Sequence, residues 1–148
     1  MGEVRFTTEI ASSLGEVFAA HVDGPRIPDW FPGVRSIEDI SGPLDRVGTS
    51  YRLRFGALIA SRCDVVAVDP PRMHARTWNA RPLGSSGRAT MRFFEERPGR
   101  TRVDFHATYE LPFGPVGRII ARLRGVQRRA ERDMRREIDC FKDFVEHR

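Results

Sequence analysis

The sequence predicts an α+β fold in which an antiparallel sheet of seven strands packs against two short helices and one long C-terminal helix. Seven segments alternate apolar and polar residues and are separated by short turns rich in Gly and Pro. Two short helical patterns stand between the first and second of these segments, and residues 116–145 repeat apolar side chains at helical spacing. The length of 148 residues is typical of one domain, so we expect a single unit over residues 1–148.

The first strand and the first helix follow from local signals near the N-terminus. Residues 3–10 alternate between apolar and polar side chains, as a half-buried strand does. Ser13 and Glu16 then form a capping-box pattern, in which the Ser side chain accepts from a free amide and the Glu side chain reaches back. This pattern predicts that a short helix begins there and spans residues 14–21.

The next elements are a second short helix and six further strands. Pro25 suits the first turn of a helix, because its missing N–H costs nothing there, and we expect this helix to run through Trp30 and Phe31. The alternation then predicts strands at 34–40, 49–56, 60–68, 73–80, 88–96 and 101–110. Because the turns between these strands are short, consecutive strands are expected to pair antiparallel.

The C-terminal segment predicts one long amphipathic helix with a basic outer face. Its apolar side chains, from Val116 to Val145, fall on one arc of the helix, and the Arg side chains fall on the opposite side. Residues 115–136 contain eight Arg and two acidic residues, a net charge of +6, whereas the whole chain has +5. The basic balance therefore belongs to this segment, and we expect the sheet to cover its apolar arc.

The composition is that of a globular protein and argues against several other classes. Apolar residues make up 40% and charged residues 30%, which disfavours a disordered chain, and no run is long enough to cross a bilayer. The N-terminus has no basic region followed by an apolar run, so we expect a cytoplasmic protein with reduced Cys63 and Cys140. Ligand spacings and nucleotide-binding motifs are missing from the sequence, so we expect no metal and no cofactor.

Six stretches lie in order along nearly the whole chain. They are I-A-S-S-L-G-E-V-F-A-A at 10–20, P-x-x-x-x-W-F-P-G-V at 25–34, G-T-S-Y-R-L-R at 48–54, V-x-V-D-P-P-R at 66–72, G-R-T-R-V-D-F at 99–105 and Y-E-L-P-F-G-P-V-G-R at 109–118. Together they resemble the START-like (SRPBCC) superfamily, in particular its polyketide cyclase/dehydrase branch. The resemblance implies a helix-grip fold, in which a curved seven-stranded sheet wraps around the C-terminal helix and encloses a deep apolar pocket. It implies no single function, because members include lipid carriers, cyclases, aromatases and hormone receptors.

Strand alternation predicts which side chains line such a pocket. Tyr51, Leu53 and Phe55 are expected to face inward, because Arg52 and Arg54 alternate with them. The same alternation turns inward Cys63, Val65, Ala67, Val103, Phe105, Ala107 and Tyr109. The predicted ligand-binding residues are Trp30, Tyr51, Leu53, Phe55, Val65, Trp78, Phe105, Tyr109, Leu123, Gln127 and Met134.

The strand at 73–80 has two alternative registers, and a shift of one residue decides between them. The pattern that follows D-P-P-R in the superfamily suggests that His74, Arg76 and Trp78 point inward. In the alternative register the inward residues are Met73, Ala75 and Thr77. In the first register, Arg76 is expected to hold an anionic or carbonyl oxygen of a ligand, with His74 as an acid or base. A charged group inside an apolar cavity must be paired or reach a ligand.

Several other positions have both a structural and a functional interpretation. Trp30 and Phe31 either plug one end of the core or form a gate whose rings stack on a ligand, and Trp78 either fills the core or supports a ligand. Gln127 is the one amide in the apolar arc of the terminal helix. It either hydrogen bonds to a neighbouring strand or orients a polar group of the ligand.

Three functions remain open at this point. The first is binding of an apolar small molecule such as a lipid, an isoprenoid or an aromatic polyketide. The second is a cyclase or aromatase that polarises a carbonyl with Arg76 or Tyr51 and moves protons with His74. The third is docking to an anionic membrane or partner surface through Arg118, Arg122, Arg129, Arg132 and Arg136. Nucleic acid is a less favoured partner, because no aromatic platform accompanies the charge.

Overall fold

Seven strands form one antiparallel sheet in the computed structural model, which describes residues 1–121 and 123–148. The strands are β1 (Gly2–Ile10), β2 (Ser36–Glu38), β3 (Ser50–Arg54), β4 (Ala60–Asp69), β5 (Met73–Asn79), β6 (Ser86–Arg97) and β7 (Arg100–Glu110). Their order across the sheet is β1-β7-β6-β5-β4-β3-β2. The predicted antiparallel meander is therefore confirmed, with β1 added at the β7 edge and β2 shorter than expected.

The helices stand at the two ends of the chain. They are α1 (Leu14–His21), a 3-10 turn η1 (Gly24–Arg26) that leads into α2 (Ile27–Trp30), then α3 (Gly114–Ala121) and α4 (Arg124–Glu146). Helix α1 has the predicted bounds, and the Ser13 hydroxyl accepts from the Glu16 amide at 3.3 Å. The Glu16 carboxylate accepts from the Ser12 hydroxyl rather than reaching back to the cap, so only half of the capping box forms. Within the described residues, no helix is long and apolar enough to span a bilayer.

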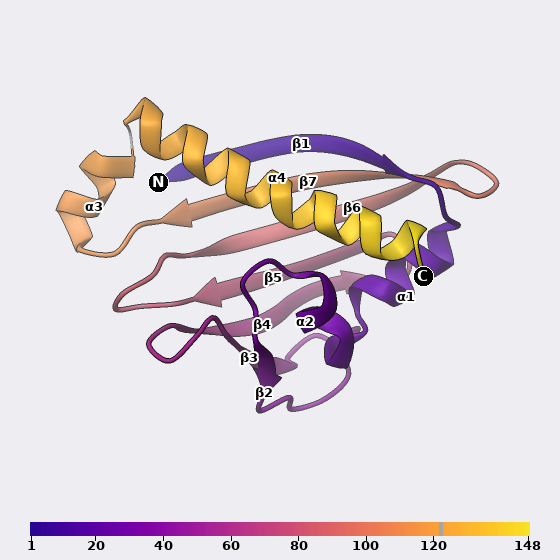
Figure 1. Cartoon of the computed structure of the whole chain (residues 1–148), viewed down its shortest axis with the longest axis horizontal. Coiled ribbons are helices and arrows are strands. Elements are labelled where there is room, and N and C mark those ends of the chain that lie inside the picture. Colours follow the sequence, from indigo (N-terminus) through magenta and orange to yellow (C-terminus); the bar gives the residue numbers. More distant parts are fainter. Residues whose placement is uncertain (122) are drawn as a thin grey trace.

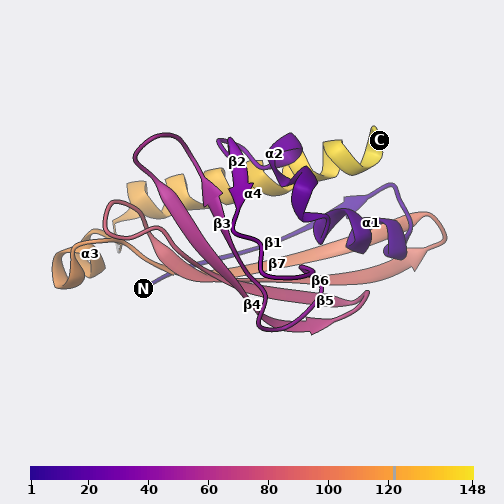
Figure 2. The ribbon, with the colours of Figure 1, turned by 90° about the horizontal axis from the view of Figure 1, so that it is seen from below.

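Helix α4 crosses one face of the sheet (Figure 1). Seen from below, α2 and β2 lie on the same side as α4, and the sheet curves beneath them (Figure 2). Apolar side chains from both layers fill the space between them towards the C-terminal end of α4. The largest of these fully buried side chains include Ile10, Met91, Phe93, Ile138 and Phe141.

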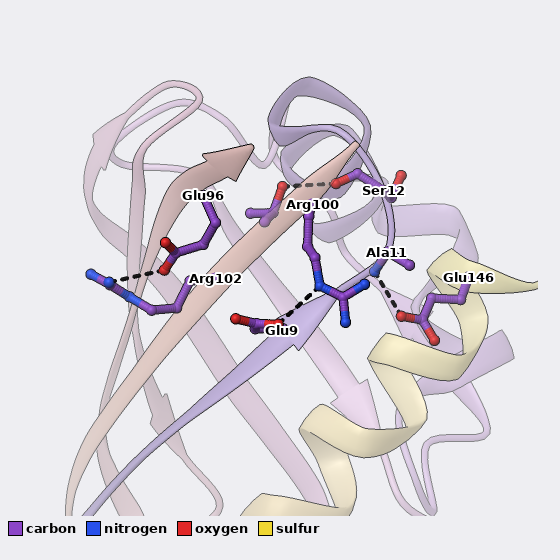
Figure 3. A network of polar contacts seen from close by, with 8 residues as sticks. Glu9, Ala11, Ser12, Glu96, Arg100, Arg102 and Glu146 are labelled. Atoms are coloured by element: carbon purple, nitrogen blue, oxygen red, sulfur yellow. Dashed lines mark hydrogen bonds and ion pairs between the residues drawn. The ribbon is translucent and has the colours of Figure 1, made fainter. Parts of the chain in front are cut away.

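The C-terminal end of α4 is held at the junction between β1 and α1 (Figure 3). The Ala11 amide donates to the Glu146 carboxylate at 2.7 Å, and the Thr101 hydroxyl donates to the Ser12 carbonyl at 2.8 Å. The buried residues of α4 are Glu137, Ile138, Phe141 and Val145, all in the same half of the helix. Tight packing of α4 is therefore confined to its C-terminal half.

The C-terminal segment forms two helices, so the prediction of one continuous helix is wrong. Leu123 is extended, with φ −71° and ψ 135°, and stands as the N-cap between α3 and α4. A continuous helix over residues 116–145 would be about 45 Å long, whereas the 11 residues of β7 span about 37 Å. The break lets α4 return over the sheet while α3 lies beyond its end (Figure 1). Arg122 lies outside the described residues.

One inward-facing prediction in β4 is also wrong, because the strand has a bulge between Val65 and Ala67. Val65 is buried as expected. Past the bulge, Val68 pairs with His74 and Ala67 pairs with Ala75. Val68 therefore shares the inner face with His74 and packs against the core, in place of Ala67.

Candidate functional site

A cavity of about 1050 Å³ lies between the concave face of the sheet and α4. Its wall side chains are mostly apolar and include Phe31, Leu53, Phe55, Cys63, Trp78, Phe105 and Met134. The lining also includes the exposed residues Ile59, Leu83 and Arg129, so the cavity opens to solvent. This mouth is formed by the β3–β4 loop, the β5–β6 loop and the start of α4, at the end of the molecule where α3 lies (Figure 1).

The register of β5 is the one suggested by the superfamily pattern. Arg76 pairs with Val65, and Trp78 pairs with Cys63; paired residues lie on the same face of the sheet. His74, Arg76 and Trp78 therefore point to the concave side. The alternative register, which would leave Arg76 in solvent, is excluded.

Arg76 forms a buried ion pair with Glu137 of α4. The Arg76 Nη2 lies 3.2 Å from Glu137 Oε2, and both side chains are at least nine-tenths buried against the cavity. Burial by itself would lower the pKa of Arg76, but the Glu137 carboxylate raises it above the ordinary value, so the guanidinium stays charged. Burial raises the pKa of Glu137, and Arg76 opposes that rise. The pair places a fixed positive group on an otherwise apolar wall.

His74 meets a second buried histidine, His21 of α1. The His74 Nδ1 lies 3.3 Å from His21 Nε2, and the His74 Nε2 lies 2.8 Å from the Leu44 carbonyl oxygen. Burial lowers the pKa of His74 to about 4 and the pKa of His21 well below its ordinary value, so both rings are neutral near pH 7. Both nitrogens of His74 are engaged, and the residue borders a small side pocket rather than the main cavity.

The predicted ligand-binding residues fall into three groups. The main cavity is lined by Leu53, Phe55, Trp78, Phe105 and Met134. The side pocket is lined by Trp30 and Tyr51, together with Leu53. Val65 is packed in the core, and Leu123, Gln127 and Tyr109 lie outside both cavities.

Leu123 and Gln127 are not among the side chains that line the cavity, although their neighbours Val126 and Arg129 are. Leu123 is 56% exposed and lines neither cavity. The Gln127 amide donates to the Glu3 carbonyl, and its oxygen accepts from the Tyr109 hydroxyl at 2.8 Å. The amide therefore ties α4 to strands β1 and β7, which is the structural one of its two interpretations.

The sequence-based prediction did not include His21 or Glu137. Glu137 stands three residues after Met134 and four before Phe141, so its charge within the apolar arc was a visible signal. His21 shares a helical face with the buried Phe18, which indicated burial but not a partner. Among the described residues, no cluster of three His, Cys, Asp or Glu side chains could hold a metal ion.

Exposed apolar side chains lie on the segments at the open end of the cavity. This apolar rim consists of Leu58, Leu83, Phe113, Val116, Ile119, Ile120 and Leu123. It comes from the β3–β4 loop, the β5–β6 loop and the α3 segment, which lie at the same end of the molecule in both views (Figures 1 and 2). Arg118, Arg129, Arg132 and Arg136 are exposed on α3 and α4, and Arg129 and Arg136 also line the mouth. The apolar arc of the C-terminal segment is therefore uncovered at this end, contrary to expectation.

A curved seven-stranded sheet that holds a cavity against a C-terminal helix defines the helix-grip class. A family model described as polyketide cyclase / dehydrase and lipid transport matches residues 1–146, so the chain belongs to this family. Comparison with curated proteins gave no match.

Solved structures share this fold at low sequence identity. A START superfamily protein from Mycobacterium smegmatis has a TM-score of 0.77 and 13% identity over 99% of this chain and 99% of its own. A conserved protein from Geobacillus kaustophilus has a TM-score of 0.76 and 14% identity, over 98% of this chain and 95% of its own. The Zhui aromatase/cyclase from Streptomyces has a TM-score of 0.74 and 18% identity, over 99% of this chain and 94% of its own. At these identities the likeness establishes the fold.

Proposed function

We propose that the protein binds an apolar small molecule, such as a lipid, an isoprenoid or an aromatic polyketide, in the cavity between the sheet and α4. The observation that carries the proposal is an apolar-walled cavity of about 1050 Å³ with one buried ion pair on its wall. Small-molecule sites have this composition, with many apolar side chains and few fixed polar groups. An apolar ligand gains free energy in proportion to the apolar surface that it removes from water.

Arg76 is the group expected to orient the ligand. One of its nitrogens is held by Glu137, so the guanidinium is fixed in place while the rest of it faces the cavities. A positive group that is already positioned and desolvated attracts an anionic or carbonyl oxygen more strongly than a group in water does. The apolar walls then supply the binding free energy, and Arg76 selects the end of the ligand that carries oxygen.

Binding of anilinonaphthalene sulfonate, an apolar and anionic fluorescent probe, tests this proposal. The Cys63→Phe variant adds a ring on the cavity side of β4, whereas the control Val66→Phe adds the same ring on the exposed side of that strand. We expect wild type and Val66→Phe to bind one probe and Cys63→Phe to lose binding while keeping its circular dichroism spectrum. Equal binding by the two variants would refute the cavity as the site. Native mass spectrometry of freshly purified protein then identifies the natural ligand class.

The cyclase alternative uses the same cavity and draws on the family membership. Arg76 would polarise a carbonyl of a poly-β-ketone chain folded against the apolar walls, so that aldol addition forms a carbon–carbon bond and dehydration releases water. Proton transfer by His74 would pass through its partner His21, because both nitrogens of His74 are engaged. If this alternative holds, a synthetic poly-β-ketone thioester is cyclised by wild type, and turnover is lost in Arg76→Ala and His74→Ala. Absence of turnover by wild type would exclude the cyclase alternative.

The apolar rim supports a second candidate function, docking to an anionic membrane. Exposed apolar side chains next to exposed Arg side chains suit insertion into the boundary of a bilayer with acidic headgroups. The rim lies on segments at the open end of the cavity, and Leu83 of the rim lines the mouth, so docking there would bring the mouth close to the membrane. Of the Arg residues predicted for this contact, Arg118, Arg129, Arg132 and Arg136 are exposed.

Co-sedimentation with vesicles tests the docking proposal. We expect binding to phosphatidylserine-containing vesicles that weakens at high salt, because salt screens the Arg side chains. The Ile119→Asp variant, in the rim, should lose binding. Val47→Asp, an exposed apolar position in the β2–β3 loop, should keep it. Equal sedimentation of the two variants, or no binding by wild type, would contradict the proposal.

A further inference from the structure

A second, much smaller cavity adjoins the main one behind Arg76. It measures about 10 Å³, which is room for one water-sized oxygen. Phe31, Leu53 and Arg76 line both cavities. The side pocket is therefore a short polar recess beside a large apolar space.

Three residues that line the side pocket each have a buried nitrogen atom without a hydrogen-bond partner among the described residues. The atoms are Arg76 Nε, Trp30 Nε1 and His21 Nδ1. The three residues are only 7%, 5% and 5% exposed, respectively. Buried polar atoms are nearly always hydrogen bonded, because leaving one unpaired is costly. Three such atoms around one recess indicate a common partner.

The histidine pair determines which of these atoms donate. The Leu44 carbonyl can only accept, so His74 Nε2 carries the proton, and the neutral ring then has an accepting Nδ1. That atom lies 3.3 Å from His21 Nε2, which must therefore be the protonated nitrogen of His21. His21 Nδ1 is left as an acceptor. The side pocket thus presents two donors, Arg76 Nε and Trp30 Nε1, and one acceptor.

We propose that the side pocket is a binding site for one O–H oxygen, taken by a water molecule in the free protein and by an alcohol or phenol hydroxyl of the ligand in the complex. A hydroxyl oxygen accepts from both donors and gives its proton to His21 Nδ1, whereas a carbonyl or ether oxygen would leave that nitrogen unpaired. The inference rests on the proposed binding function and narrows it to apolar ligands that carry a hydroxyl group.

A crystal structure at high resolution tests the site directly. We expect one ordered oxygen within about 2.6–3.2 Å of all three nitrogen atoms in the ligand-free protein. In crystals soaked with β-naphthol, the hydroxyl of this probe should replace that oxygen while the rings lie in the main cavity. Lack of an oxygen in the ligand-free crystals would overturn the proposal. A water that stays in place beside bound β-naphthol would overturn its ligand half.

Binding of a matched pair of probes tests the chemistry of the site in solution. We expect wild type to bind β-naphthol about tenfold more tightly than β-methylnaphthalene, which has the same size but no O–H group. His21→Phe removes the acceptor and should bring this ratio close to one, and Trp30→Phe, which removes a donor, should lower it as well. The control His106→Phe removes an imidazole from the opposite face of the sheet and should keep the wild-type ratio. An unchanged ratio in folded His21→Phe and Trp30→Phe would contradict the proposal.

The outcomes separate this inference from the binding function on which it rests. Failure of both probes to bind would count against the apolar cavity as a ligand site, and the oxygen in ligand-free crystals would still decide the side pocket. Binding of both probes with equal affinity would leave the cavity as a ligand site and remove its preference for hydroxyl groups.

Discussion

Arg76 of β5 and Glu137 of α4 carry opposite charges and form an ion pair that is buried between the strand and the helix. Such a pair contributes little net stability, because the loss of hydration offsets most of the attraction between the charges. Losing one partner is different, because the other charge then stays buried and unpaired. The stability of the chain should therefore depend on keeping both members or neither.

Replacing Glu137 with Leu should lower the free energy of unfolding by about 3–5 kcal/mol, because Arg76 is left charged in an apolar wall. The double variant Arg76→Met/Glu137→Leu should recover most of that loss, and guanidinium chloride unfolding of the full cycle measures both effects. Asp133→Ala provides the control, since its pair with Arg129 is exposed and spans 3.9 Å. That change should cost less than about 1 kcal/mol. Additive losses in the double variant would contradict the prediction.

The two buried histidines should make stability depend on pH. The folded-state pKa of His74 is about 4 against an ordinary value of 6.5, so the unfolded chain binds more protons between these two values. The contribution of His74 to the free energy of unfolding should be fully present above about pH 6.5. It should fall by about 3 kcal/mol as the pH drops towards 4. Protonation would also place positive charge beside Arg76, which lies in the same pocket.

Unfolding curves at several pH values between 7 and 4 measure this dependence. Replacing both His21 and His74 with Phe should flatten it, because no group with a lowered pKa remains at that place. His147→Asn, at an exposed position near the C-terminus, should leave the dependence unchanged. Burial also raises the pKa of Glu137, but every variant keeps this residue, so the difference between the variants isolates the histidines. A double variant as pH-sensitive as wild type would show that other groups are responsible.

The two C-terminal helices differ in how closely they pack against the rest of the chain, and the surroundings of one glycine in each helix show this difference. Gly117 of α3 lies against the backbone carbonyl of Pro112, so an added methyl group would collide with it. Gly125, in the first turn of α4, has open space around its α-carbon. Helix α3 therefore depends on a close backbone contact with the chain that leaves β7, whereas the start of α4 makes no such contact.

Gly117→Ala should destabilise the protein or detach α3 from the end of β7. Gly125→Ala should raise stability by up to about 1 kcal/mol, because alanine is the better helix former and meets no neighbour. Thermal unfolding followed by circular dichroism measures both changes, and limited proteolysis detects release of α3. Equal effects of the two substitutions would refute the close packing of α3.

Viewed as a whole, the molecule has a packed end and an open end. Near α1, the C-terminal half of α4 is buried against the sheet, and its last turn is tied to Ala11 (Figure 3). At the other end, the first half of α4 stands over the cavity, and the apolar rim is exposed. Entry of the proposed ligand would require such an end, because a fully packed core leaves no path to the interior.

Amide hydrogen exchange should be graded along α4. Residues 124–134 should exchange through local opening, and residues 137–145 should exchange only near global unfolding, because the buried side chains are confined to the second segment. Adding anilinonaphthalene sulfonate should slow exchange in the first segment if the probe fills the cavity. Mass spectrometry of peptides from both segments makes the comparison. Uniform protection along the helix would argue against an open end.

The number of strands, their order along the chain and the bounds of α1 were predictable from sequence, because these features depend on neighbours in the chain. The alternation of apolar and polar residues indicates which side chains face water, and turn residues indicate where strands end. Ser13 caps α1 by accepting a hydrogen bond from the Glu16 amide. The same local logic placed Leu53, Phe55 and Phe105 on the cavity wall. Glu137 was detectable in the same way, as a charge at an apolar position.

The remaining features depend on what lies opposite in space. The register of β5, the bulge at Val65 and the break before α4 follow from strand pairing and from the length of the sheet, neither of which leaves a local signal. Arg76 and Glu137 are 61 residues apart, and His21 and His74 are 53 apart. Local patterns predict which residues are buried, but only the folded chain determines which buried polar groups meet, because long-range contacts depend on the whole topology.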